Sequence, residues 1–234
     1  MTQPPIVVFD LDGTLADTAP DLIGTLNAIM SREGLPAVPL AAARDMIGAG
    51  ARALVERGFE AAGRELTPAR SDALFRDFLA HYAENLCIHS RLFDNLVPAL
   101  NALEREGFRL AVCTNKVEGH SVRLIEALGL GGRFAAICGR DTFPYSKPDA
   151  RHLLLTIERA GGDPARAVMV GDSKTDIDTA KAAGIPVVAV TFGYTDIPVR
   201  NLSPEAVIDD FAELVAAVGT CRGSWSGHGG RDRD

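Results

Sequence analysis

The sequence predicts an α/β protein in which a doubly wound parallel sheet carries a helical domain, inserted after the first strand. From residue 93 onward, short apolar runs alternate with segments of helical period, an order typical of parallel sheets with right-handed crossovers. Between the first apolar run and residue 90, only helical periodicity is present. The 234 residues, 47% of them hydrophobic, are sufficient for a sizeable core.

The inserted helical unit is predicted from its periodicity and from the residues that interrupt it. In residues 20–32 apolar side chains recur on one helical face, and Gly34 and Pro36 end the pattern. Glycine and proline separate the later patterns in the same way, which places helices at residues 20–32, 40–47, 51–62 and 68–85.

The α/β part is predicted from short apolar runs that alternate with longer helical patterns. Strands are expected at residues 6–9, 109–113, 134–138, 167–170 and 187–190. Helices are expected at residues 97–106, 120–128, 150–160 and 175–183. Such sheets bind ligands beyond the carboxyl ends of their strands, so functional side chains are expected there.

The predicted organisation is a core of residues 1–15 and 90–218, with an inserted helical cap at residues 16–89. Residues 219–234 are rich in Gly, Ser, Arg and Asp and lack periodicity, so we expect a disordered tail.

Composition excludes several classes of partner. The net charge of −7 and the absence of a long basic run argue against nucleic acid and anionic membranes. The four cysteines are scattered without Cys-x-x-Cys spacing, which argues against a zinc site and favours reduced thiols. The sequence shows neither a signal segment nor a membrane-spanning run, so we expect a cytoplasmic protein. We expect it to be either a monomer or a homodimer.

Two carboxylates follow the first predicted strand. Because side chains alternate along an extended backbone, Asp10 and Asp12 point to the same side. Carboxylates this close repel unless a cation lies between them or one carries a proton. The pair indicates a divalent metal site, a nucleophile beside an acid/base partner, or both. The structural alternative is an ordinary strand-to-turn junction.

Three further strand ends carry groups suited to phosphate or to a metal ion. Thr114 and Asn115 offer hydrogen bonds, and Lys147 offers an ammonium group just before a proline. Asp172 and Asp176 lie where a strand gives way to a helix, and hard oxygen ligands of this kind suit Mg²⁺. Each piece taken alone is also compatible with a turn or a helix cap.

The order of the four segments Asp-x-Asp-Gly-Thr, Thr-Asn, Lys-Pro and Gly-Asp-Ser-x-x-Asp resembles the haloacid dehalogenase superfamily, in its phosphatase branch with a helical cap. The resemblance covers nearly all of residues 5–215 and implies a Rossmann-like core. It also implies a small phosphorylated metabolite as substrate.

The resemblance assigns a role to each of these side chains. Asp10 would be the nucleophile that forms an aspartyl-phosphate, and Asp12 would be the acid/base group. Thr114 and Lys147 would bind the transferring phosphoryl group, with Asn115 orienting a neighbour. The implied cofactor is Mg²⁺, held by Asp10, the main-chain carbonyl of Asp12 and Asp172, with Asp176 holding metal-bound waters.

Within the superfamily, the segments Ile47–Gly50 and Gly139–Thr142 resemble those of bacterial phosphoglycolate phosphatases. This likeness implies 2-phosphoglycolate as substrate, and we expect Arg52 and Arg57 of the cap to bind its carboxylate. The alternative for either arginine is a solvated helix face. Other substrates remain open, namely pyrophosphate, nucleotides and sugar phosphates, as does a phosphomutase. A non-catalytic phosphoacceptor module is the more distant alternative.

Overall fold

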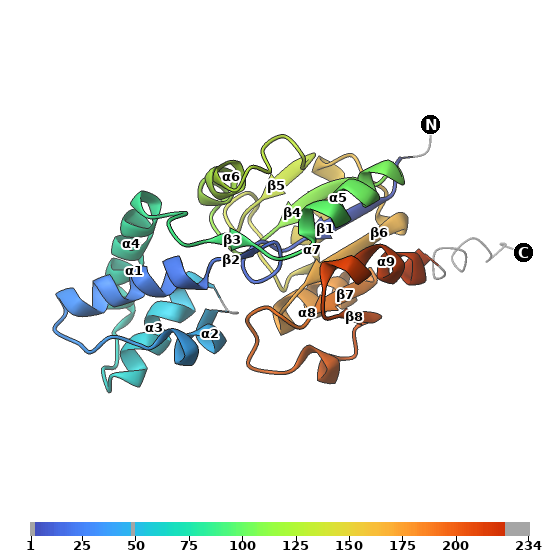
Figure 1. The fold of residues 1–234 in the computed structure, drawn as a ribbon. Helices are drawn as coiled ribbons and strands as arrows, with labels where there is room; N and C mark the ends of the chain where they lie inside the picture. Colours follow the sequence, from blue (N-terminus) through green and yellow to red (C-terminus); the bar gives the residue numbers. More distant parts are fainter. Residues whose placement is uncertain (1–2, 48–49, 223–234) are drawn as a thin grey trace, which may run out of the picture.

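A parallel sheet forms the centre of the computed structural model, which describes residues 3–47 and 50–222 (Figure 1). Within these residues the sheet has six strands in the order β5-β4-β1-β6-β7-β8. Their bounds are β1 (Ile6–Phe9), β4 (Arg109–Cys113), β5 (Ala136–Cys138), β6 (Ala167–Gly171), β7 (Val187–Val190) and β8 (Ala206–Ile208). The predicted fold class is confirmed.

Both faces of the sheet are buried, as its apolar strands require. Val7 and Phe9 pack with α5 (Leu96–Arg105), α6 (Glu118–Ala127) and α9 (Leu214–Arg222) on one face. Ile6 and Val8 alternate with them and pack on the other face, with α7 (Ala150–Arg159) and α8 (Lys174–Ala183). The result is a three-layer core.

The cap consists of α1 (Ala19–Arg32), α2 (Leu40–Ile47), α3 (Ala51–Ala61) and α4 (Pro68–Glu84), which lie beside the core (Figure 1). Proline in the first turn of α1 and of α4 suits the helix start, where the backbone N–H has no intrahelical partner. The helices bury a common apolar interior that includes Leu26, Leu54 and Phe78.

Two short strands connect the cap to the core. β2 (Ala16–Asp17) and β3 (Arg91–Leu92) pair as an antiparallel ribbon where the chain enters and leaves the cap. Beside the ribbon, the buried carboxylate of Asp21 accepts hydrogen bonds from the backbone N–H groups of Ile88, His89 and Ser90. One carboxylate therefore ties the first cap helix to the segment that returns to the core.

Several elements depart from the sequence prediction. β2, β3 and β8 were not expected, because each has only two or three residues and no distinctive apolar period. The predicted disordered tail is wrong at residues 219–222, which belong to α9, where Cys221 is buried. The rest of that predicted tail lies outside the described residues.

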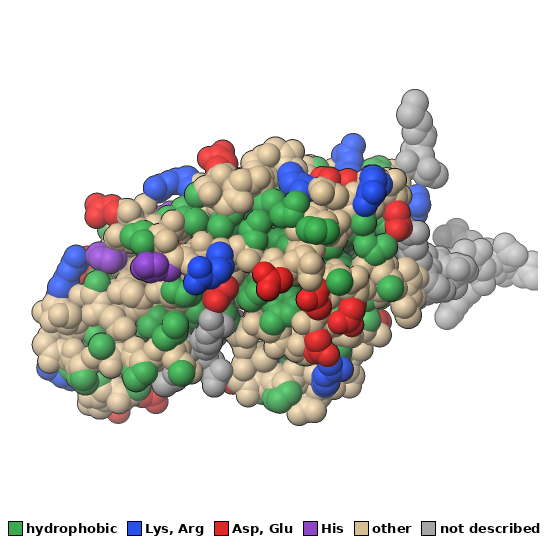
Figure 2. Space-filling model, in the orientation of Figure 1, with side chains coloured by type: hydrophobic (Ala, Val, Ile, Leu, Met, Phe, Trp, Pro, Cys, Tyr) green, Lys and Arg blue, Asp and Glu red, His purple; other side chains and the backbone are tan. Residues whose placement is uncertain are grey.

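The surface view shows acidic and basic side chains interspersed over the face drawn in Figure 2. Among the described residues, no helix has both the length and the apolar character needed to cross a bilayer.

Candidate active site

Two neighbouring strands bring acidic side chains together at the carboxyl edge of the sheet. β1 and β6 are parallel neighbours with Phe9 opposite Val170, so Asp10 and Asp172, which directly follow these strands, are offset by only one residue. The N–H of Asp10 donates to the carbonyl of Val170 across this junction, at 2.9 Å. Among the described residues, carboxylate oxygens of Asp10, Asp172 and Asp176 lie within 4.8 Å of one another.

Lys147 provides the positive charge at this cluster. Its Nζ lies 3.0 Å from Oδ1 of Asp10 and 2.5 Å from Oδ1 of Asp176, and the side chain is 2% exposed. The Nδ2 of Asn115 donates to the carbonyl of Lys147 at 3.0 Å. Asn115 therefore supports the backbone that presents the lysine.

The electrostatics of the cluster leave an excess of negative charge. Burial raises the pKa of Asp10 to about 6, although the ammonium group of Lys147 opposes this shift. Burial and the neighbouring carboxylate of Asp176 raise the pKa of Asp172 well above its ordinary value. Burial disfavours the charged form of Lys147, but Asp10 and Asp176 outweigh it and raise the pKa of the lysine. Carboxylates crowded in this way favour the binding of a cation.

Short contacts fix Asp172 in place. Its Oδ1 accepts from the hydroxyl of Thr14 at 2.8 Å, and its Oδ2 accepts from the N–H of Tyr194 at 2.6 Å. At Gly13, where φ is +83°, a Cβ atom would lie 2.4 Å from Oδ2 of Asp172. Only glycine fits here, because both the backbone conformation and the space exclude a side chain.

Both carboxylate oxygens of Asp176 accept hydrogen bonds. Oδ1 receives Lys147, while Oδ2 accepts from the N–H and the hydroxyl of Ser173, at 3.1 and 2.7 Å, in a capping box that begins α8. These contacts suit a residue that positions its neighbours rather than one that lies open to a ligand.

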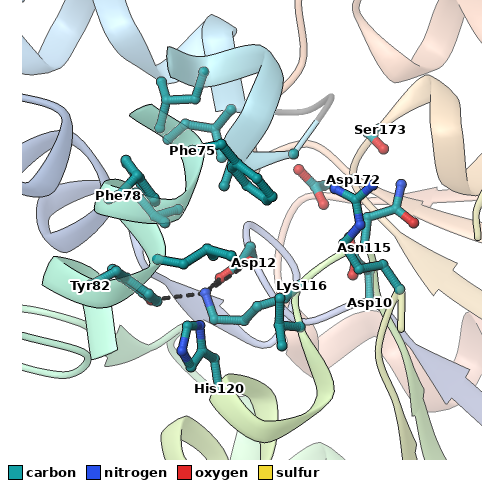
Figure 3. A pocket seen from close by; sticks show the side chains of 18 residues that line it. Asp10, Asp12, Phe75, Phe78, Tyr82, Asn115, Lys116, His120, Asp172 and Ser173 are labelled. Atoms are coloured by element: carbon teal, nitrogen blue, oxygen red, sulfur yellow. Dashed lines mark hydrogen bonds and ion pairs between the residues drawn. The ribbon is translucent and has the colours of Figure 1, made fainter. Parts of the chain in front are cut away.

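Asp12 faces a lysine and a cap tyrosine. Lys116 Nζ lies 3.0 Å from Oδ1 of Asp12 and 2.8 Å from the hydroxyl oxygen of Tyr82, which belongs to α4 (Figure 3). The hydroxyl of Thr18 donates to the same Oδ1 at 2.7 Å. Asp12 is therefore held by Lys116 and Thr18, while Tyr82 of the cap contacts the lysine.

A cavity of about 50 Å³ separates the cap from the edge of the sheet. Aromatic side chains of α4, namely Phe75, Phe78 and Tyr82, lie on one side of it (Figure 3). Carboxylates of the core lie on the other side. The lining also includes Asn115, Lys116, His120 and Arg140.

Some of the site residues predicted from the sequence line the cavity, and others do not. Asp10, Asp12, Asp172 and Asn115 line the cavity, while Lys147 and Asp176 lie directly behind Asp10. Thr114 is 2% exposed and is not among the lining residues; its Oγ1 accepts from the N–H of Lys116 at 3.3 Å.

The two cap arginines do not reach the cavity, contrary to the expectation that they bind substrate there. Arg52 forms an ion pair with Asp72 at 2.6 Å, and Arg57 donates to the carbonyl of Met46 at 3.2 Å. Neither side chain is part of the cavity lining. Helix periodicity alone does not specify which polar face turns toward the core.

Sequence reasoning missed several lining residues, among them Lys116, Tyr82 and Arg140. Lys116 directly follows Thr114-Asn115 in a chain with only four lysines, a signal that could have identified it. Arg140 lies within the segment Gly139–Thr142, whose resemblance to phosphoglycolate phosphatases is a second such signal, whereas Tyr82 carries none.

The fold and the site together define a class of enzyme. The chain combines a Rossmann-like sheet with a helical cap, and an aspartate cluster with a buried lysine lies at the carboxyl edge of the sheet. This combination is typical of hydrolases that use an aspartate as the nucleophile. The family model for haloacid dehalogenase-like hydrolases matches residues 7–190. The chain belongs to this family.

Relatives cover nearly the whole chain. A phosphoglycolate phosphatase of Mesorhizobium japonicum is 54% identical over 92% of this chain and 94% of its own length. One from Agrobacterium fabrum is 48% identical, with 92% of each chain covered. A crystal structure of a predicted phosphoglycolate phosphatase from Haemophilus somnus is 35% identical, has a TM-score of 0.84, and matches 92% of this chain and 98% of its own.

Proposed function

We propose that the protein is a Mg²⁺-dependent phosphatase that converts 2-phosphoglycolate and water into glycolate and phosphate. The observation that carries the chemistry is the contact of Lys147 with Asp10 inside a cluster of carboxylates. The choice of substrate is supported by the Mesorhizobium and Agrobacterium relatives.

In the first step, a carboxylate oxygen of Asp10 attacks phosphorus and the bond from phosphorus to the ester oxygen breaks. Asp12 gives a proton to that leaving oxygen, and glycolate departs. The product on the enzyme is an aspartyl-phosphate at Asp10. Lys147, beside Asp10, stabilises the negative charge of the transferring phosphoryl group.

In the second step, Asp12 takes a proton from water, whose oxygen attacks phosphorus. The bond between phosphorus and Asp10 breaks, which releases phosphate and restores the carboxylate. Lys116 contacts both oxygens of Asp12, at 3.0 and 3.2 Å, and so holds the group that moves the proton.

The donor atoms fit Mg²⁺. Asp10 and Asp172 present hard carboxylate oxygens within one cluster. Their raised pKa values reflect burial and, after it, the neighbouring carboxylates, whose repulsion a cation would relieve. The main-chain carbonyl of Asp12 is the further proposed ligand, and Asp176 would support the site from behind. When bound, the ion supplies charge that stabilises the phosphoryl oxygens.

The size of the cavity favours a small substrate. A single water requires about 10–15 Å³ on this scale, so a cavity of about 50 Å³ suits a small metabolite better than a nucleotide. The four cysteines are free thiols, which fits a reaction in the reducing cytoplasm.

Phosphate release by the purified protein tests this function. The substrates are 2-phosphoglycolate, sugar phosphates, pyrophosphate and nucleotides, with Asp10→Asn and EDTA as controls. We expect preferential release from 2-phosphoglycolate, abolished by either control. Equal turnover of all substrates would refute the proposal that 2-phosphoglycolate is the preferred substrate. Mg²⁺-dependent turnover by Asp10→Asn would refute the proposed mechanism.

A further inference from the structure

Two side chains with a permanent positive charge, Lys116 and Arg140, line the cavity within the described residues. Lys116 is already engaged, because Asp12 and the hydroxyl of Tyr82 both accept hydrogen bonds from its Nζ. His120 also lines the cavity, but burial and the nearby Lys116 lower its pKa below the ordinary value, which disfavours the charged ring.

Arg140 is placed differently. Its backbone N–H donates to the carbonyl of Lys116 at 3.0 Å, which anchors the start of the segment that follows β5. Its guanidinium carbon lies 5.8 Å from the centroid of the Phe75 ring, within the range of a cation–π contact. No described residue forms an ion pair or a hydrogen bond with this guanidinium group, and the residue is exposed. Its planar set of donors is therefore available to a ligand.

We infer that Arg140 binds the carboxylate of the substrate and thereby selects 2-phosphoglycolate over phosphoesters without a second anionic group. This inference rests on the proposed function, in which the phosphoryl group occupies the site at Asp10. A guanidinium group matches a carboxylate with two parallel hydrogen bonds, a geometry that a lysine does not reproduce.

In this inference the carboxylate is bound by Arg140 of the core rather than by the cap arginines expected from the sequence. Arg52 also contacts Phe75, with its guanidinium carbon 4.6 Å from the ring centroid, but it is paired with Asp72 and is not among the lining residues. Phe75 then serves as an aromatic wall contributed by the cap, against which Arg140 of the core is held.

Steady-state kinetics with two matched substrates test the role of Arg140. In 2-hydroxyethyl phosphate, a hydroxymethyl group replaces the carboxylate of 2-phosphoglycolate. For Arg140→Gln we expect kcat/KM to fall about 10- to 100-fold on 2-phosphoglycolate, the loss expected for a charge-assisted hydrogen-bond pair. This loss should lie mainly in KM, and 2-hydroxyethyl phosphate should be little affected.

Two further variants sharpen the comparison. Arg140→Lys keeps the charge but loses the planar fork, so it should recover only part of the preference. Arg52→Gln is the matched control from the cap, and the ratio of its activities on the two substrates should equal that of the wild type. An equal loss on both substrates for Arg140→Gln, or a changed ratio for Arg52→Gln alone, would overturn the inference.

A binding measurement separates this inference from the proposed function. Calorimetry compares 3-phosphonopropionate, in which a methylene group replaces the ester oxygen, with 3-hydroxypropylphosphonate, which lacks the carboxylate. Arg140→Gln should weaken only the carboxylated ligand, whether or not the wild type hydrolyses 2-phosphoglycolate. Absence of hydrolysis would refute the proposed function, whereas equal binding of 3-phosphonopropionate by wild type and Arg140→Gln would refute the role of Arg140.

Discussion

The carboxyl edge of the sheet and the helical cap meet at one cavity, yet they contribute different kinds of side chain. The core supplies charged groups such as Asp10, Asp172 and Lys147, which are buried and held by short contacts. The cap supplies mainly apolar and aromatic groups, with Tyr82 as a polar exception. The difference fits the proposed function, in which the core carries the reaction and the cap shapes and encloses the cavity.

The same contrast applies to ion pairs. Lys147 is 2% exposed beside Asp176, which is fully buried, whereas Arg52 and Asp72 of the cap are 37% and 54% exposed. Solvent screens the cap pair, but the core pair has little solvent to compensate for a lost partner.

Lys147→Met should have the largest effect on stability. It leaves Asp10 and Asp176 facing each other without the ammonium group, and breaking a buried pair of this kind costs about 3–5 kcal/mol. Arg52→Gln removes the exposed pair and should cost at most about 1 kcal/mol. Urea unfolding in EDTA measures both variants, and comparable losses would contradict the contrast between the two regions.

Asp21→Ala tests how the cap is joined to the core. The substitution leaves the N–H groups of Ile88, His89 and Ser90 without their acceptor and should cost about 2–3 kcal/mol, the range for hydrogen bonds to a charged group. Urea unfolding measures the loss. Asp21→Asn keeps one acceptor oxygen, so it should lose less, and the account would fail if Asn were as damaging as Ala.

His152→Gln tests a buried group on α7, beneath the catalytic edge. Burial lowers the pKa of His152 from 6.5 to about 4. Between these pH values, the unfolded chain therefore binds a proton at His152 that the folded chain does not bind. Stability of the wild type therefore falls as the pH decreases through this window, and His152 should account for about 3 kcal/mol of that fall. Unfolding curves for wild type and variant at several pH values measure this contribution; parallel pH profiles would contradict it.

Tyr82→Phe tests the polar contact between the two regions and should have the smallest effect. It removes the hydroxyl that meets Lys116 but keeps the ring that stacks on Phe78, with centroids 6.1 Å apart. We expect kcat/KM for 2-phosphoglycolate to fall about 2- to 10-fold, the value of one hydrogen bond. An unchanged kcat/KM would show that the cap does not support Asp12 through Lys116.

The core was more predictable than the cap because its information is local in the sequence. The strands β1, β4 and β6 lead directly into Asp10, Thr114 and Asp172, and the parallel sheet then gathers these ends along one edge. Asp10 and Asp172 are therefore predictable from the strands they follow, whereas Lys147, in the loop after β5, is predictable from its place before a proline.

Contacts between distant segments could not be predicted in this way. The pairing of Lys116 with Tyr82 depends on how α4 packs on the core, and the outward direction of Arg52 depends on Asp72, which lies on another helix. Arg140 lies in a segment that the sequence singles out, Gly139–Thr142, but only the folded structure places it at the cavity. Local patterns specify the elements, whereas tertiary packing decides which polar faces meet.

The most direct measurement is the location of the phosphoryl group during turnover. Radiolabelled 2-phosphoglycolate is mixed with excess enzyme, the reaction is quenched in acid, and the labelled peptide is mapped. We expect the label on the peptide that contains Asp10 and, in Asp10→Asn, no label and no phosphate release. Label on another residue, or turnover by Asp10→Asn, would contradict the assignment of the chemistry to this edge of the core.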